Sequence, residues 1–382
     1  MAELARVVGR RHGLAAGPTL IVVGGMHGNE PAGALATERV LARLDEVAPE
    51  LRGDLVALRG NLRALALDRR YQARDLNRQW TLEALARVEV ALPHDDPEAA
   101  EVRELRAELD AALAAARGPV FFLDFHTTSA AGVPFALIGD TLAQRELARF
   151  LPIPAILGLE EQLDGLLSEY LTARGATTIA VEGGQHHSAA AADNLEAVLW
   201  IALAATGLVA REALPGVAAA EQLLAQTCGA LPRLIEVLGR HPVLPDDEFR
   251  MEPGHANIGR MRAGELLARD RRGEIRAPHD GLLLMPLYQA QGEDGFFLGR
   301  EIPEWEQRAT FWARRLRLDR VVMALPGVHR ERAGVHEANE RIVVGPSAAA
   351  MVPVAMFRWF GFRRVIESST GLTLQRRVRG RA

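Results

Sequence analysis

The chain has 382 residues, of which 48% are hydrophobic and 25% charged, proportions typical of a globular protein with room for two hydrophobic cores. Its formal net charge of -4 excludes the broad positive field that binding to nucleic acid or to an anionic membrane requires. Because the sequence has a single cysteine, no signal peptide and no apolar run of about 20 residues, we expect a cytoplasmic protein without disulfides or membrane spans.

In the first half of the chain, short apolar segments alternate with longer segments whose apolar residues recur at helical spacing. The segments predicted to be strands are Thr19–Val23, Asp54–Leu58, Val120–Asp124, Phe135–Ile138 and Thr177–Val181. The segments predicted to be helices are Pro31–Leu44, Pro97–Ala116, Glu161–Arg174 and Ala189–Ala205. Alternation of this kind predicts a fold of the α/β class, in which helices cover a sheet.

The second half of the chain has a different pattern. A helical stretch near Val217–Gly239, kinked or broken at Pro232, is expected to link two parts of the protein. From about His241 onward, short strand-like segments separated by glycine and proline predict a small β-rich module. We therefore divide the chain into a larger domain at residues 1–212, a helical linker at 213–240 and a β-rich C-terminal domain at 241–382.

A glycine-rich turn, Gly24–Glu30, follows the first predicted strand and precedes a predicted helix. The carboxyl ends of strands are where open α/β sheets bind ligands. His27 and Glu30 lie three residues apart on this turn and can point at one ion. Zinc sites that catalyse hydrolysis commonly combine two histidines with one glutamate and leave a fourth position for water. Taken alone, however, the pair is more simply explained as a turn histidine and a glutamate that begins a helix.

A third candidate ligand, His126, lies just past the predicted strand Val120–Asp124. Two strand ends that both deliver metal-binding side chains rarely coincide by chance, so we predict a metal site formed by His27, Glu30 and His126. Asp124 lies on the same strand face as His126, and its carboxylate could orient the imidazole. Mixed histidine and carboxylate ligation with one open position favours zinc over other divalent ions.

Two further segments carry polar side chains suited to hydrolysis. Glu182 ends the predicted strand Thr177–Val181, where a carboxylate could take a proton from a water whose pKa zinc has lowered. In the segment Arg70–Arg78, adjacent asparagine and arginine side chains could hold a carboxylate. Alone, Glu182 is more simply explained as a helix-capping or surface glutamate, and the segment Arg70–Arg78 as a charged loop. In a chain without lysine, an arginine does not show that guanidinium geometry was required.

Together these segments resemble the succinylglutamate desuccinylase/aspartoacylase family, which is related to the zinc carboxypeptidases. The resemblance spans about residues 18 to 210 and rests on His27-x-x-Glu30, Asp75-Leu76-Asn77-Arg78, Asp124-x-His126 and Glu182-Gly183-Gly184-Gln185, in this order. It implies a mixed sheet flanked by helices in a catalytic domain at residues 1–212. It also implies that the smaller β-rich C-terminal domain helps to roof the site.

The resemblance implies that His27, Glu30 and His126 bind one Zn²⁺ per chain and that Glu182 is the general base. Water would then attack an amide carbonyl directly, without a covalent enzyme intermediate. The expected reaction is hydrolysis of a small N-acyl amino acid or a related carboxylate. The alternatives are a carboxypeptidase-like metallopeptidase and a non-catalytic binding protein that keeps the metal, although the intact set of residues argues against the second.

The resemblance also implies substrate contacts. Arg70 would polarise the scissile carbonyl, Asn77 and Arg78 would bind a carboxylate of the substrate, and Asn61 would add a polar contact. The expected partner is therefore a small carboxylate-bearing molecule, and homo-oligomerisation is left open. The acyl group and the amine are not predicted, because an arginine that selects substrates in some relatives has no match at the expected spacing. His186 and His187 follow the Glu182 motif and could line the pocket, but they are more simply explained as histidines of a surface loop.

Overall fold

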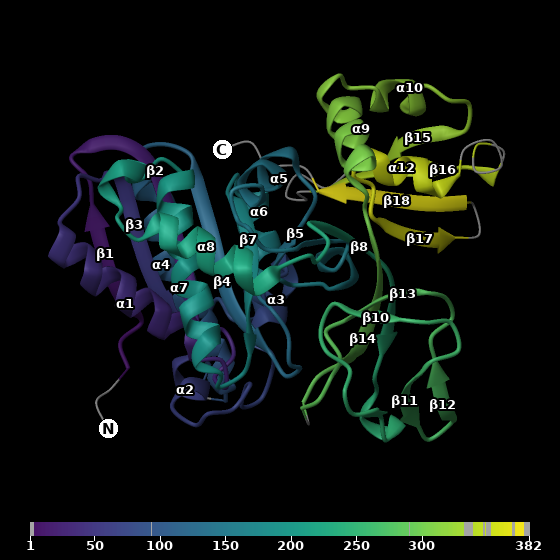
Figure 1. Cartoon of the computed structure of the whole chain (residues 1–382), viewed down its shortest axis with the longest axis horizontal. Helices are drawn as coiled ribbons and strands as arrows, with labels where there is room; N and C mark the ends of the chain where they lie inside the picture. Colours follow the sequence, from purple (N-terminus) through teal and green to yellow (C-terminus); the bar gives the residue numbers. More distant parts are fainter. Residues whose placement is uncertain are drawn as a thin grey trace.

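Figure 1 shows a computed structural model of the chain, which describes residues 4–92, 94–289, 291–331, 339–346, 348, 353–368 and 371–377. Its largest element is an eleven-stranded sheet. In spatial order, the strands are β1 (Val7–His12), β3 (Arg52–Arg59), β2 (Ala15–Gly24), β4 (Val120–Thr128), β7 (Thr177–Gln185), β5 (Phe135–Ile138), β6 (Ala155–Leu157), β8 (Leu234–Pro242), β14 (Asp294–Glu301), β13 (Gly281–Leu284) and β10 (Gly259–Met261).

The sheet is mixed: two groups of parallel strands meet at the antiparallel pair β7 and β5, and both edges of the sheet are antiparallel. Strands β3, β2, β4 and β7 run in one direction, and β1 lies antiparallel beside β3. β5 is antiparallel to β7, and β14, β13 and β10 continue the sheet beyond β8 as an antiparallel ladder. The predicted α/β class and mixed sheet are therefore confirmed.

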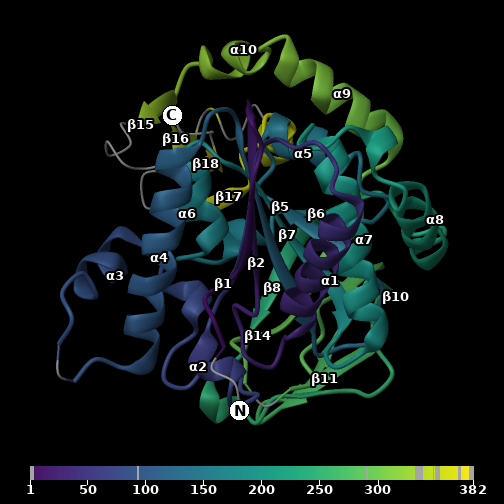
Figure 2. The same ribbon diagram turned by 90° about the vertical axis from the view of Figure 1, so that its left-hand side faces the viewer.

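Helices pack on both faces of the parallel strands. α1 (Ala32–Val47), α7 (Ala189–Ala205) and α8 (Val217–Cys228) lie on one face, and α4 (Pro97–Ala115) and α6 (Leu167–Ala173) lie on the other, as Figure 2 shows. The shorter helices are α2 (Leu62–Leu65), η1 (Leu76–Arg78), α3 (Leu82–Arg87), α5 (Leu142–Ala148), η2 (Glu160–Gln162), η3 (Arg211–Ala213) and η4 (Pro245–Asp247). No helix of the described residues is long and apolar enough to cross a membrane.

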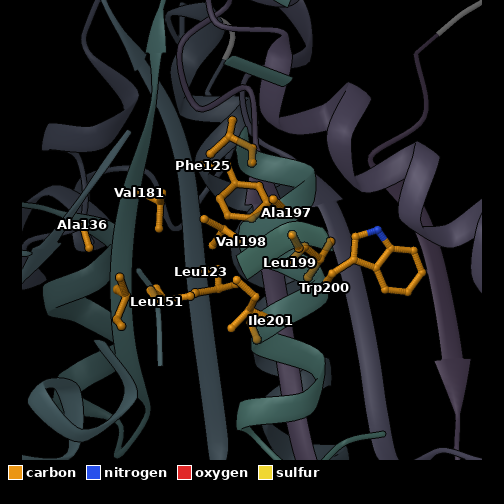
Figure 3. Packing of buried hydrophobic residues seen from close by; sticks show 14 of the residues in the cluster. Leu123, Phe125, Ala136, Leu151, Val181, Ala197, Val198, Leu199, Trp200 and Ile201 are labelled. Atoms are coloured by element: carbon orange, nitrogen blue, oxygen red, sulfur yellow. The ribbon is translucent and has the colours of Figure 1, made fainter. Parts of the chain in front are cut away.

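The apolar run of β2 explains its place in the middle of the sheet. Leu20 and Val22 belong to the core on the α1 and α7 side, whereas Ile21 and Val23 belong to the core on the α4 and α6 side. All four are fully buried, and burial of each such side chain contributes about 1.5–3 kcal/mol. Figure 3 shows the core on the α1 and α7 side of the sheet, in which side chains of α7 pack against β4 and β7.

Two smaller sheets complete the C-terminal half and lie on the same side of the molecule in Figure 1. One contains β9 (Arg250–Met251), β11 (Leu266–Asp270) and β12 (Gly273–Arg276). The other contains β15 (Val328–Glu331), β16 (Asn339–Val344), β17 (Arg364–Ser368) and β18 (Gly371–Arg377), with α9 (Glu304–Arg315), α10 (Asp319–Met323) and α12 (Val354–Trp359) beside it.

A buried ion cluster ties the four-stranded sheet and its helices to the main body. Asp140, which follows β5, accepts hydrogen bonds from Arg145, from Arg314 of α9 at 2.7 Å and from Arg363 at 2.7 Å. Burial raises the pKa of Asp140, but the three guanidinium groups outweigh it and hold the pKa far below its ordinary value of 3.8. Asp140 therefore stays ionised.

The linker is where the structure departs most from the sequence-based prediction. The helix expected through Gly239 ends at Cys228, because Gly229 has a left-handed φ of 51° and Pro232 follows. The residues after it form β8, which crosses the expected boundary at residue 240 and pairs with both β6 and β14. The division into domains at 1–212, 213–240 and 241–382 stays a prediction.

Candidate active site

His27, Glu30 and His126 converge at the carboxyl ends of β2 and β4. A ligand atom from each lies within 4.8 Å of the others, and all three residues are buried. The turn after β2 can carry His27 into this position because Gly28 touches the α2 segment, where a Cβ atom would lie 2.1 Å from the carbonyl carbon of Ala64. His126 lies inside β4 rather than past its end.

The two imidazoles present the same nitrogen to the carboxylate between them. Nδ1 of His27 lies 2.8 Å from Oε1 of Glu30, and Nδ1 of His126 lies 3.0 Å from Oε2. The opposite nitrogens face other carboxylates: Nε2 of His27 lies 3.1 Å from Asp75, and Nε2 of His126 lies 3.1 Å from Asp124. These carboxylates favour the tautomer whose Nδ1 lone pair is free to bind a metal.

The electrostatics of this cluster suit a divalent cation. Burial raises the pKa of Glu30, but His27 and His126 hold it well below its ordinary value, so Glu30 is anionic. Burial lowers the pKa of His126, but Asp124 and Glu30 raise it well above the ordinary value. The carboxylates thus attract positive charge to this point, and zinc would replace the imidazole protons. Two imidazoles and one carboxylate form a donor set that fits catalytic zinc.

Glu182 faces the cluster from the neighbouring strand. In the pairing of β4 with β7 it lies opposite His126, and its side chain is buried. Its Oε2 atom is buried and has no hydrogen-bond partner among the described residues. Burial raises the pKa of Glu182 to about 7. A carboxylate with a free oxygen and a pKa near neutrality can accept a proton and return it.

Arg70 reaches the same point from a loop that a buried carboxylate holds in place. Its guanidinium lies 2.9 Å from Asp75 and 3.5 Å from Glu30. The same loop continues through Gln72, two residues after Arg70. Glu98 of α4 accepts hydrogen bonds from the backbone N–H group of Gln72 at 2.8 Å and from those of the next two residues. Glu98 is buried, so the loop conformation depends on this one carboxylate.

Asn61 does not line the cavity that the other site residues surround. Its side chain accepts a hydrogen bond from the backbone of Ala64 at the start of α2 and donates one to Glu98 at 3.2 Å. Both ends of the amide thus bind other residues of the protein, and Asn61 is fully buried. Asn61 thus supports the carboxylate that holds the Arg70 loop, and the expected substrate contact stays a prediction.

Asn77 and Arg78 both line the cavity, as expected. The side-chain oxygen of Asn77 accepts from the backbone of Leu167 at 3.0 Å, which leaves its NH₂ group for a ligand in the cavity. Arg78 donates to the backbone of Asn77 and lies 3.9 Å from Asp294 of β14. At that distance Asp294 attracts Arg78 without occupying its donors, so a substrate carboxylate could bind there.

The remaining cavity wall comes from residues that the sequence did not indicate. His186, expected on the surface, lines the cavity between Thr127 at 2.7 Å and Gln289 at 3.1 Å, whereas His187 is exposed. The C-terminal half supplies lining residues from the segment between β13 and β14 and from β14 itself. The segment supplies Met285, Pro286, Leu287, Gln289, Gly292 and Glu293, and β14 supplies Asp294 and Phe297. The space between all lining residues is about 1080 Å³, which includes its opening to solvent.

Residues 16–202 match the model of the succinylglutamate desuccinylase/aspartoacylase catalytic domain. These residues form a catalytic domain of that family. The domain contains every residue proposed above for the metal, the base and the carboxylate, from His27 to Glu182. The resemblance to the succinylglutamate desuccinylase/aspartoacylase family is thus confirmed over these residues, whereas the role of each residue stays a prediction.

Solved structures of the family have the same fold over about three quarters of the chain. A succinylglutamate desuccinylase from Vibrio cholerae is 18% identical, with 75% of this chain and 82% of that chain covered and a TM-score of 0.54. An ectoine utilization protein from Ruegeria pomeroyi is 20% identical, with 75% and 86% covered and a TM-score of 0.54. Murine aminoacylase 3 is 19% identical, with 76% and 97% covered and a TM-score of 0.53. No curated protein matches the chain.

Proposed function

We propose that this protein is a zinc-dependent deacylase, which hydrolyses the amide bond of a small N-acyl amino acid or a related carboxylate. The observation that carries the proposal is the placement of Glu182 directly opposite His126 in the sheet, with one carboxylate oxygen free beside the three converging ligands. Membership of a family that includes desuccinylases and aspartoacylases supports the same reaction class.

His27, Glu30 and His126 would hold one zinc ion. When bound, zinc polarises a carbonyl group and lowers the pKa of a water molecule. Glu182 takes a proton from the attacking water, and the water oxygen bonds to the amide carbon. Glu182 then gives that proton to the amide nitrogen as the carbon–nitrogen bond breaks, and a carboxylic acid and an amine leave.

The other polar residues would orient the substrate. Arg70 places its guanidinium beside Glu30, where it stabilises the negative charge that develops on the carbonyl oxygen. Asn77 and Arg78 bind a carboxylate of the substrate, which fixes the amide between the proposed zinc ligands and Glu182. His186 and Gln289 both line the cavity and join the two halves of the chain there by a hydrogen bond of 3.1 Å.

The test combines metal analysis with an activity screen. Purified protein should contain about one zinc ion per chain, and it should release a free amino acid from N-acyl amino acids until a chelator removes the metal. Addition of zinc should then restore the activity. Preferential cleavage of short peptides would favour a carboxypeptidase-like activity instead. Zinc binding without any turnover would indicate a binding protein, and a protein that cannot bind zinc would refute the proposal.

A further inference from the structure

Glu182 and Ala180 lie on the same face of β7, two residues apart, and the residues beside Ala180 on β5 are apolar. Across strands β4, β7 and β5, His126 pairs with Glu182 and Glu182 with Phe135. In the next row on this face, Asp124 pairs with Ala180 and Ala180 with Leu137. Ala180 and Leu137 both line the cavity, so the space beside Glu182 is bounded by hydrocarbon and by a small side chain.

This apolar surface continues around the cavity. The further apolar residues that line it are Leu159, Leu163, Leu166, Met285, Pro286, Leu287 and Phe297. Leu159 and Phe297 belong, with Leu137 and Ala180, to one buried core cluster, and Leu163 and Met285 pack against it. The cavity thus opens onto a hydrophobic core, and an apolar group that entered would lose water contacts on most sides.

The charges that line the cavity limit how many carboxylates a substrate can have. Among the described residues that line it, the arginines are Arg70 and Arg78, whereas the carboxylates are Glu30, Asp75, Asp124, Glu160, Glu182, Glu293 and Asp294. Arg70 already pairs with Asp75, which leaves Arg78 as the arginine for a substrate carboxylate. A second carboxylate would face hydrocarbon or other carboxylates, and burial of an unpaired charge is costly.

We infer that the substrate is a monocarboxylate with an apolar group beside the scissile amide, rather than a dicarboxylate such as an N-succinyl or N-acylaspartate compound. This inference rests on the proposed function. The apolar group can belong to the acyl chain or to the side chain of the amino acid, and both would present the same hydrocarbon to Ala180 and Leu137.

Isosteric substrate pairs separate charge from size. N-acetylleucine and N-acetylaspartate differ mainly in an isopropyl group against a carboxylate, and N-(4-methylpentanoyl)glycine and N-succinylglycine differ in the same way. N-acetylglycine serves as the reference. In one of the two pairs, the group that differs should contact the apolar surface at Ala180 and Leu137. In that pair, kcat/KM of the zinc-loaded protein should be at least about tenfold higher for the apolar compound than for the dicarboxylate. The pair with the larger ratio identifies the acyl side or the amino-acid side.

Binding provides a second readout that does not require turnover. Calorimetry with the products should show tighter binding of leucine than of aspartate, or of 4-methylpentanoate than of succinate. Higher kcat/KM for the dicarboxylates, or tighter binding of their products, would overturn the inference and leave the proposed deacylase intact. No hydrolysis of any of the five compounds would count against the proposed function itself.

Substitution of Ala180 by leucine tests whether the apolar wall contacts the substrate. The added side chain would fill the space between Asp124 and Leu137, so kcat/KM should fall about tenfold more for the preferred apolar substrate than for N-acetylglycine. A substitution that merely disturbed Glu182 would lower both values alike, and an unchanged ratio would overturn the assignment. Ala219→Leu, at an exposed position of α8, is the matched control and should leave both values unchanged.

Discussion

Oδ2 of Asp124 lies 3.1 Å from Nε2 of His126, across the imidazole from the nitrogen that faces Glu30. The carboxylate fixes the orientation of the ring and favours its Nδ1 lone pair for metal binding. Asp124→Asn should therefore weaken zinc binding by about 10–100-fold, as measured by competition with a chromophoric chelator. Asp45→Asn, on the exposed surface of α1, should leave the affinity unchanged. Equal affinities for both variants would show that the contact does not support a metal ligand.

Glu182→Gln keeps the size of the side chain but removes its ability to carry the proton. The variant should bind zinc as the parent protein does, because Glu182 is not among the converging ligands. Its kcat should fall by about 10²–10⁴-fold, the usual contribution of general acid–base catalysis. Zinc content and steady-state kinetics measured on the same preparation check both statements. Turnover close to that of the parent protein would rule out Glu182 as the base.

Glu98→Ala removes the acceptor for the loop that carries Arg70 and leaves three partly buried N–H groups without this partner. The free energy of unfolding should fall by about 1–3 kcal/mol, and kcat/KM should fall as well because Arg70 loses its fixed position. Urea unfolding and kinetics measure the two effects. Glu104→Ala removes a half-exposed carboxylate of the same helix, and should cost less than about 1 kcal/mol and leave kcat/KM unchanged.

The buried cluster around Asp140 predicts how stability depends on pH. The pKa of Asp140 is depressed in the folded state, so above its ordinary value of 3.8 the ionised carboxylate contributes its full stabilisation. As the pH falls below that value, the unfolded chain takes up the proton first, and the contribution is lost progressively. The difference in unfolding free energy between the parent protein and Asp140→Asn should therefore be constant at pH 5–7 and narrow toward pH 3. A difference that widened on acidification would contradict the depressed pKa.

Local patterns in the sequence predicted the parallel strands and brought the candidate metal ligands to their ends, whereas metal binding itself stays a prediction. The bounds of β5 and α7 agree with the predicted segments, and His27, Glu30 and His126 converge as expected. These features depend on apolar periodicity and on the rule that parallel strands end at one edge of a sheet. Glu182 also lies where its strand placed it, opposite His126.

Features that depend on distant contacts were missed. β8 follows an apolar helix with only a short break, and its strand conformation is fixed by pairing with β6 and β14. Asn61 has the residue type of a substrate contact, yet its amide is bound by Glu98, 37 residues away in the chain. In the sequence His186 resembles a surface histidine, whereas in the fold its imidazole contacts Gln289, which lies far away in the chain. No local pattern records these contacts.

The last residues of the eleven-stranded sheet that line the cavity come late in the chain, in β14. The proposed zinc ligands have all been synthesised once translation has passed residue 126. Phe297, which also lines the cavity, belongs to β14, a strand that pairs with β8 and β13. During translation, the nascent polypeptide would therefore contain the proposed metal ligands and Glu182 long before it contains the residues that enclose the binding site. A chain that ended at about residue 240 would contain the proposed ligands but would lack the part of the cavity wall that β14 supplies.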